Sequence, residues 1–112
     1  MPNHSADLPR VFQALSDPTR LAVVARLARG PASMTALAEP FDMALPSFSQ
    51  HLRLLEGCGL VRSTKTGRVR TFELQPETLK TVEHWLDVIR ERWDQRLDRL
   101  DAYLLTLKEP KS

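Results

Sequence analysis

The 112-residue chain contains one cysteine, one tyrosine and four glycines, and it has no long hydrophobic run. A lone Cys58 cannot form a disulfide or a thiolate metal cluster within one chain. We also expect no other metal site and no cofactor. No stretch approaches the roughly 18 uncharged apolar residues of a membrane span. Residues 1–10 also lack the apolar run of a secretory signal. The sequence therefore predicts a cytoplasmic protein that does not associate with membranes.

The sequence also lacks a glycine-rich phosphate loop and a catalytic constellation. Ser47 and Ser49 are near His51 along the chain. However, a catalytic triad is a spatial arrangement that also needs an orienting acid and an oxyanion hole. Residues spaced by two or four along one helix have poor geometry for this chemistry. We therefore do not expect an enzyme.

Charge is unevenly distributed, although the formal net charge is only +2. Residues 44–72 contain five bases and a single acid, Glu56, whereas residues 76–112 are close to neutral. A basic patch next to a neutral region favours a polyanionic partner such as DNA. A solvated basic surface is the alternative interpretation.

Apolar spacing and capping residues predict four helices in the first half of the chain. They cover residues 8–15, residues 18 to about 29, a short segment from residue 34, and residues 44–57. Asp7, Asp17 and Ser33 are the expected N-caps. The face of the second helix that we expect to be buried carries Leu21, Val24, Ala25 and Ala28.

Two strands and one long helix are predicted in the second half. The strands, residues 61–65 and 69–74, flank Thr66-Gly67, where glycine supplies the positive φ of a tight turn. From Pro76 to about Leu107, apolar residues recur every three or four positions. About 30 helical residues span roughly 45 Å, so the far end of the stripe needs the surface of a second copy. The fold class is mainly α with a small β-hairpin, as one winged helix–turn–helix domain over residues 1–112.

Residues 34–57 have the order of a helix–turn–helix, in which the second helix enters the major groove. Ser47, Ser49 and Gln50 are small or polar side chains near its start, and glutamine can pair bidentately with adenine. Arg53, one turn further on, is expected to contact a phosphate or a guanine. An ordinary amphipathic helix with a solvated polar face is the alternative.

The hairpin of residues 61–74 is predicted to be a basic wing beside this helix. Arg68 follows the turn glycine, with Lys65 and Arg70 on either side, and arginine suits a narrow minor groove or a phosphate. Arg70 has the strand parity of Phe72, so we expect it to reach the surface only through strand twist. A hairpin whose charges merely prevent edge pairing is the alternative.

Several strings in this order are specific as a set: Leu15–Leu21 (LSDPTRL), Ser49–Leu52 (SQHL), Gly59–Val61 (GLV) and the wing residues 66–74. Together they resemble the ArsR/SmtB family of bacterial repressors, over residues 8–74. The resemblance implies a homodimer that binds an inverted repeat in double-stranded DNA at its own promoter and releases it on a small signal. It also places His51 in the DNA-reading helix, as a backbone contact or a packing residue.

The resemblance further implies dimerisation through the helices of residues 8–15 and 76–107. The interface residues expected there are Leu8, Val11, Phe12, Leu86, Ile89, Trp93, Leu97 and Leu100. The family's metal-binding cysteines are missing here, and the last helix holds one histidine, His84, so the signal stays open and a small-molecule effector is possible. A winged helix that binds proteins and not DNA is the alternative function, although it would not need a basic patch.

Overall fold

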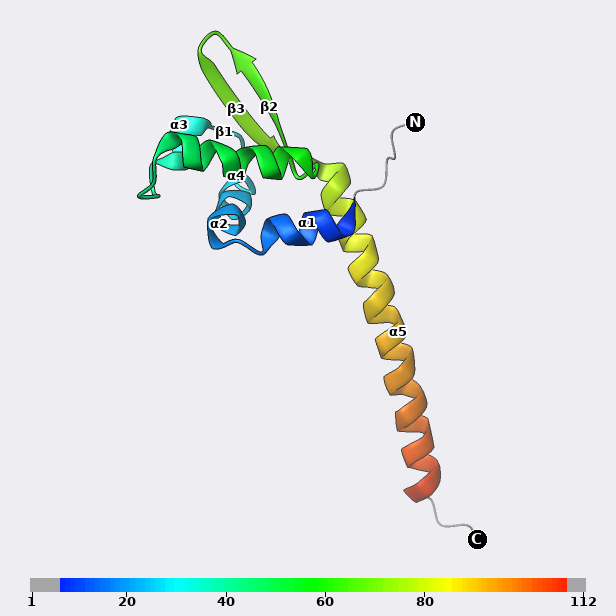
Figure 1. Cartoon of the computed structure of the whole chain (residues 1–112). Helices are drawn as coiled ribbons and strands as arrows, with labels where there is room; N and C mark the ends of the chain where they lie inside the picture. The colour runs from blue at the N-terminus through cyan, green and yellow to red at the C-terminus, as the bar shows by residue number, and fades with distance from the viewer. Residues whose placement is uncertain (1–6, 109–112) are drawn as a thin grey trace. The chain divides into compact units, whose positions relative to one another are not determined.

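The computed structural model describes residues 7–108, and the chain divides after Thr81 into two compact units. The second unit consists of the greater part of α5, whose first turn belongs to the first unit (Figure 1). The elements are α1 (Leu8–Leu15), α2 (Pro18–Leu27), β1 (Ala32–Ser33), α3 (Met34–Ala38), α4 (Leu45–Gly57), β2 (Val61–Thr66), β3 (Val69–Leu74) and α5 (Pro76–Lys108). The predicted mainly helical, winged helix–turn–helix fold is confirmed.

The three predicted N-caps are present at the starts of α1, α2 and α3. In each case the capping side chain accepts a hydrogen bond from the backbone N–H three residues further on. The pairs are Asp7 with Arg10 (3.3 Å), Asp17 with Arg20 (3.1 Å) and Ser33 with Ala36 (3.1 Å). Such caps satisfy N–H groups that have no partner within the helix, each contributing about 1 kcal/mol.

The hairpin is part of a three-stranded antiparallel sheet in the order β1-β3-β2, and its strand β1 was not predicted from the sequence. β1 is two residues long and pairs Ala32 with Phe72 on the central strand. Two residues are too few to show the apolar–polar alternation by which a strand is recognised in a sequence. The extended conformation of β1 comes from its pairing with β3. In the turn between β2 and β3, Gly67 has φ +63°, which fits the first central position of a type II′ turn.

The core of the first unit is entirely apolar. Three residues of α4, Phe48, Leu52 and Leu55, are fully buried, and the helix packs against β2, where Val61 is also fully buried. Among residues 7–108 no polar or charged side chain is buried. Burial of these side chains therefore provides the main stabilisation of the unit.

The buried face of α2 differs from the expected one. Val23 and Leu27 are buried, whereas Leu21 is 53% exposed and the helix ends at Leu27, not near Arg29. The segment LAVVA has apolar residues around most of the helix, so its sequence is compatible with more than one buried face. The packing of α2 on α4 and β3 determines which face is buried.

The start of α5 is joined to the segment between α4 and β2. The Gln75 backbone N–H donates to the Leu60 carbonyl (2.9 Å), and its side-chain amide donates to the Val61 carbonyl (3.2 Å). The Thr78 hydroxyl donates to the Gly59 carbonyl (2.6 Å). These three bonds fix the start of the long helix to the segment that leads from α4 into β2.

α5 itself is one continuous helix of 33 residues (Figure 1). None of its residues is buried in the single chain, although the predicted apolar stripe runs along it. No helix within residues 7–108 is long and apolar enough to cross a membrane.

Candidate nucleic-acid interface

The orientation of α4 leaves a short polar face exposed near its start. Phe48, Leu52 and Leu55 point into the core and so fix the rotation of the helix. Ser47 and Gln50 are exposed on its outer side, and Ser49 is half-buried. The Phe41 ring packs on Phe48, with 5.5 Å between ring centroids, and so anchors the turn before α4.

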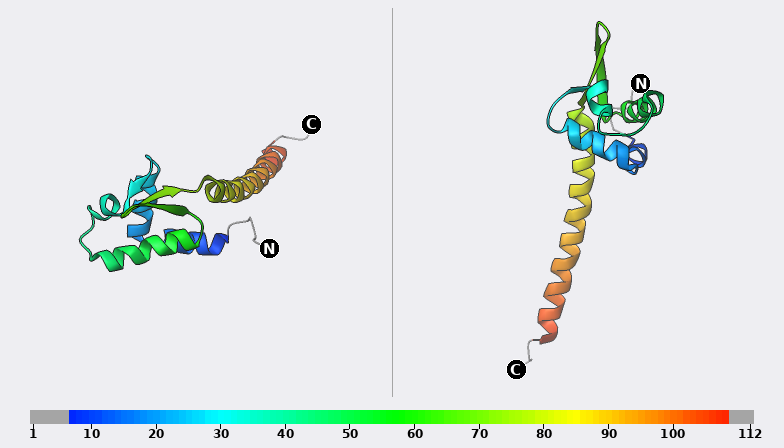
Figure 2. Two further views of the ribbon diagram at one scale, coloured as in Figure 1. Left: turned by 90° about the horizontal axis from the view of Figure 1, so that it is seen from above. Right: turned by 90° about the vertical axis from the view of Figure 1, so that its left-hand side faces the viewer.

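The hairpin β2–β3 projects from the helices of the first unit as a thin two-stranded blade (Figures 1 and 2). Lys65 pairs directly with Arg70, and the next pair on the same face is Ser63 with Phe72. The shared parity of Arg70 and Phe72 is thus as predicted. Arg70 is nevertheless exposed, because it lies one pair further along the projecting hairpin than the buried Phe72. Arg68 is exposed in the turn at the tip.

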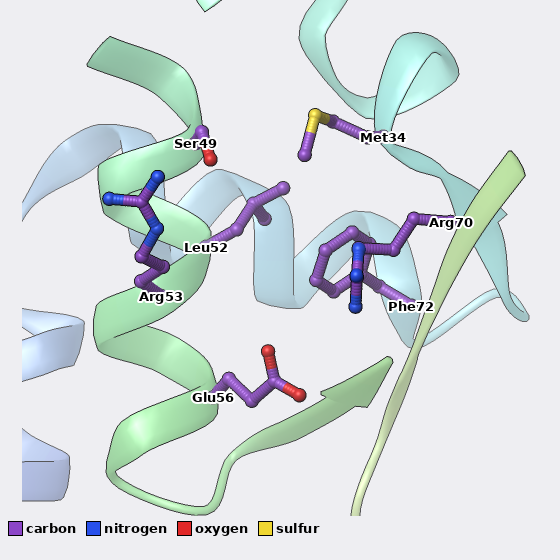
Figure 3. Close-up of a pocket in the computed structure, with 7 residues that line it drawn as sticks. All are labelled: Met34, Ser49, Leu52, Arg53, Glu56, Arg70 and Phe72. Atoms are coloured by element: carbon purple, nitrogen blue, oxygen red, sulfur yellow. The ribbon is translucent and has the colours of Figure 1, made fainter. Parts of the chain in front are cut away.

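A groove of about 340 Å³ separates α4 from β3, and it brings together predicted residues from both elements (Figure 3). Its lining residues are Met34, Ser49, Leu52, Arg53, Glu56, Arg70 and Phe72. Arg53 stays beside α4 in Figure 3, whereas Arg70 and Glu56 extend into the space between helix and strand. Ser49, Arg53 and Arg70 therefore border one concave surface.

Glu56 was not predicted to be part of the site. The Arg70 guanidinium donates to the Ser63 hydroxyl (2.9 Å), and that hydroxyl donates to a Glu56 carboxylate oxygen (2.9 Å). The only sequence signal was that Glu56 is the single acid among residues 44–72. Within the hairpin, Arg62 forms a direct ion pair with Glu73 (2.8 Å), and this pair lies on the strand face opposite to that of Arg70.

His51 is half-buried and bonded to another helix, unlike the exposed Ser47 and Gln50. Its Nδ1 accepts a hydrogen bond from the Arg20 guanidinium (2.9 Å), so the ring proton is on Nε2. The same guanidinium donates through Nε to the Ala14 carbonyl at the end of α1 (2.7 Å). Arg20 thus joins α1, α2 and α4, a role that sequence reasoning missed although Arg20 lies in the LSDPTRL string.

The carboxylate of Asp17 completes this cluster, with 3.7 Å between its Oδ2 and His51 Nδ1. The hydrogen bond from the Arg20 backbone N–H lowers the pKa of Asp17. Partial burial opposes this change, and the positive charge of the nearby Arg20 guanidinium reinforces it. The ionised carboxylate is therefore the form that caps α2.

No group of three or more His, Cys, Asp or Glu side chains within residues 7–108 is arranged to hold a metal ion. Cys58 is buried at the end of α4, and its thiol donates to the Leu55 carbonyl (3.3 Å).

The structure changes one of the residues expected at a dimer interface. Val11 has no exposed surface because it packs in the core of its own chain, so it has nothing to offer a partner. Leu8 is half-buried, and Phe12 is 38% exposed. The five expected residues of α5 are 40–58% exposed: Leu86, Ile89, Trp93, Leu97 and Leu100.

These features together define a class of protein. The structure has a short helix, a turn and a second helix with a polar outer face, and a basic β-hairpin lies next to them. This arrangement is a winged helix–turn–helix, the architecture of DNA-binding transcriptional regulators.

Comparisons with known proteins identify the family. The family profile of a helix-turn-helix domain matches residues 15–64. The HTH-type transcriptional regulator Rv2034 of Mycobacterium tuberculosis is 40% identical over 78 residues, which cover 70% of this chain and 73% of the relative. The arsenical resistance operon repressor of Staphylococcus xylosus is 31% identical over 83 residues, 74% of this chain and 80% of the relative.

A solved structure agrees with these relatives. The crystal structure of the ArsR family transcriptional regulator RHA00566 superposes with a TM-score of 0.73 at 53% identity, over 78% of this chain and 90% of that one. The chain belongs to the ArsR family of helix–turn–helix transcriptional regulators.

Proposed function

We propose that this protein is a homodimeric, cytoplasmic repressor that binds an inverted-repeat operator in double-stranded DNA, including one at its own promoter. One observation carries the proposal. The exposed polar start of α4 is accompanied by a hairpin on which Lys65, Arg68 and Arg70 are all exposed. Polar side chains on a groove-entering helix suit the reading of base edges, and a basic hairpin suits the backbone or the minor groove.

The roles of the side chains follow from their positions. Ser47, Ser49 and Gln50 read bases, with the Gln50 amide pairing with an adenine. Contacts to the DNA sugar–phosphate backbone come from four basic side chains on α4 and the wing: Arg53, Lys65, Arg68 and Arg70. His51, held by Arg20, supports the orientation of α4. Only its Nε2 is free to contact the DNA backbone.

A second copy covers the stripe on α5. The exposed stripe supports this arrangement because an isolated helix of this length would leave its apolar side in water. Leu8 and Phe12 are the expected contribution of α1. A two-fold dimer presents two α4 helices, so the operator has two half-sites about 34–36 Å, or a multiple of one DNA turn, apart.

Repression follows from occupancy, because a dimer on a promoter blocks access to it. The name of the Staphylococcus xylosus relative as a repressor favours this over activation. A small-molecule effector that binds the DNA-free form more tightly would release the operator by linkage.

The test is binding of the purified protein to its own upstream DNA across a range of salt concentrations. Four backbone-contacting residues in each of two protomers predict a slope of log K against log salt near about −7. Arg68→Ala should weaken binding to all duplexes and make the slope shallower by about 2, since each protomer loses one contact. No binding to the upstream fragment at low salt would refute self-regulation.

Gln50→Ala tests the reading of bases separately. It should change the preferred sequence while leaving binding to random duplexes nearly unchanged. A uniform loss of affinity for all sequences would show that Gln50 does not read a base. The alternative function is a winged helix that binds other proteins. It would be favoured if this protein bound no DNA and bound another protein with an affinity that did not depend on salt.

A further inference from the structure

Glu56 places a negative charge inside the basic interface. It lies on the side of α4 that faces β3, and it lines the same groove as Arg53 and Arg70 (Figure 3). DNA brings phosphates to this surface, so a carboxylate here opposes the contact that the two arginines favour.

Glu56 also acts on Arg70 through Ser63. The Ser63 hydroxyl accepts from the Arg70 guanidinium and donates its one proton to the Glu56 carboxylate, each over 2.9 Å. Both hydrogen bonds have a charged partner, which makes them stronger than bonds between neutral groups. We name these three residues the Glu56 relay. It holds the guanidinium of Arg70 in the groove, facing the protein and not a phosphate.

The relay also balances charge on the wing. Lys65 lies directly opposite Arg70 on the neighbouring strand, and like charges at such positions repel each other. The nearby Glu56 carboxylate offsets this repulsion in the DNA-free protein. A DNA phosphate between Lys65 and Arg70 would offset it equally well. Glu56 and the phosphate therefore compete for the same guanidinium.

We propose that Glu56 sets the DNA affinity of this protein: it retains Arg70 through Ser63 in the free state, and DNA binds by displacing that link. The inference rests on the proposed function, because it assumes that the wing contacts the DNA backbone. Glu56 lowers affinity for every duplex, so binding to DNA without the operator sequence stays weak. Base contacts by α4 are then required for lasting occupancy.

The test compares the wild type with five variants in binding assays with an operator duplex and a random duplex at one salt concentration. Glu56→Gln keeps the size of the side chain and an acceptor for Ser63 while removing the charge. It should tighten binding to both duplexes about 3- to 10-fold, for two exposed charge contacts per dimer. Glu73→Gln is the matched control, since it adds the same net charge to the protein but frees Arg62, on the other face of the hairpin. It should change affinity less than 2-fold, taking roughly 2-fold as the limit for a remote charge.

Three further variants test the connection to Arg70. Arg70→Gln alone should weaken binding, and Glu56→Gln combined with Arg70→Gln should show little of the gain seen with Glu56→Gln alone. Ser63→Ala, as a further variant, breaks the relay without changing charge and should give a smaller gain than Glu56→Gln. Circular dichroism and thermal unfolding check that each variant is folded.

The results separate the inference from the proposed function. If the wild-type protein binds no duplex, the proposed function fails and the inference falls with it. If the wild type binds but Glu56→Gln matches either the wild type or Glu73→Gln, the inference alone is wrong. A gain that persists in full without Arg70, or a Ser63→Ala protein that binds like the wild type, also overturns it.

Discussion

Replacing Arg20 with lysine keeps the charge of the side chain but removes its ability to join three helices. The guanidinium donates through Nε to the Ala14 carbonyl (2.7 Å) and through Nη1 to His51 Nδ1 (2.9 Å). These acceptors lie on α1 and α4, and the fork geometry of arginine serves both at once. A lysine ammonium is a single point on a flexible chain, so it can replace one of the two bonds but not both.

The expected loss follows from one hydrogen bond with a charged donor. Such a bond contributes about 1.5–3 kcal/mol when well buried. Both Arg20 bonds are only partly buried, so water replaces some of the loss, and we expect about 1–2 kcal/mol in the free energy of unfolding. For a domain of this size the melting temperature should fall by roughly 5–10 °C.

Urea unfolding followed by circular dichroism at a fixed protein concentration measures this loss, and the m-value should not change. Arg26→Lys is the matched control on the same helix, because the Arg26 guanidinium makes only a 3.4 Å bond to the Gly30 carbonyl. It should cost less than about 0.5 kcal/mol. If both variants unfold at the same urea concentration, Arg20 does not join the helices as described. DNA affinity should also fall for Arg20→Lys alone, since α4 loses a restraint.

Three further predictions concern pH, the core and assembly. Asp17 has a lowered pKa in the folded protein, so its contribution to the free energy of unfolding is complete above the ordinary pKa of an aspartate and is lost as pH falls through the folded value. The stability advantage of the wild type over Asp17→Asn should therefore shrink below about pH 4. An advantage that stays constant with pH would refute this reasoning. Phe72→Ala should cost about 3–5 kcal/mol, measured by urea unfolding, because Phe72 is 2% exposed on the central strand. Leu97→Arg should give monomers in light scattering, whereas Leu105→Arg, on the same helix but off the stripe, should not; dimers in both cases would place the interface elsewhere.

Features controlled by local chemistry were predictable from the sequence. Asp7, Asp17 and Ser33 cap their helices as expected, since an N-cap needs only a suitable side chain and the next three residues. The hairpin was predictable for the same reason, because Gly67 provides the turn and the strands follow directly. The long helix was predictable from spacing alone, since no breaker interrupts it.

Features produced by contacts between distant residues were not predictable in this way. Arg20 and His51 are 31 positions apart, and the sequence contains no sign that one would bind the other. The Glu56 relay likewise depends on how α4 faces the sheet. Val11 shows a related difficulty. An apolar residue on a helix stripe has the same appearance whether it packs in its own chain or against a partner, so only the folded chain assigned it to the core.

The apolar interior described above has a consequence for how this protein can diverge. The buried residues of the described chain include no polar or charged side chain, while Ser47 and Gln50 are exposed. If Ser47 and Gln50 read the operator as proposed, substitutions at these two positions can change its preferred sequence and leave the buried core as it is. After a gene duplication, one copy can be retargeted to a new promoter by substitutions on α4 that leave folding intact.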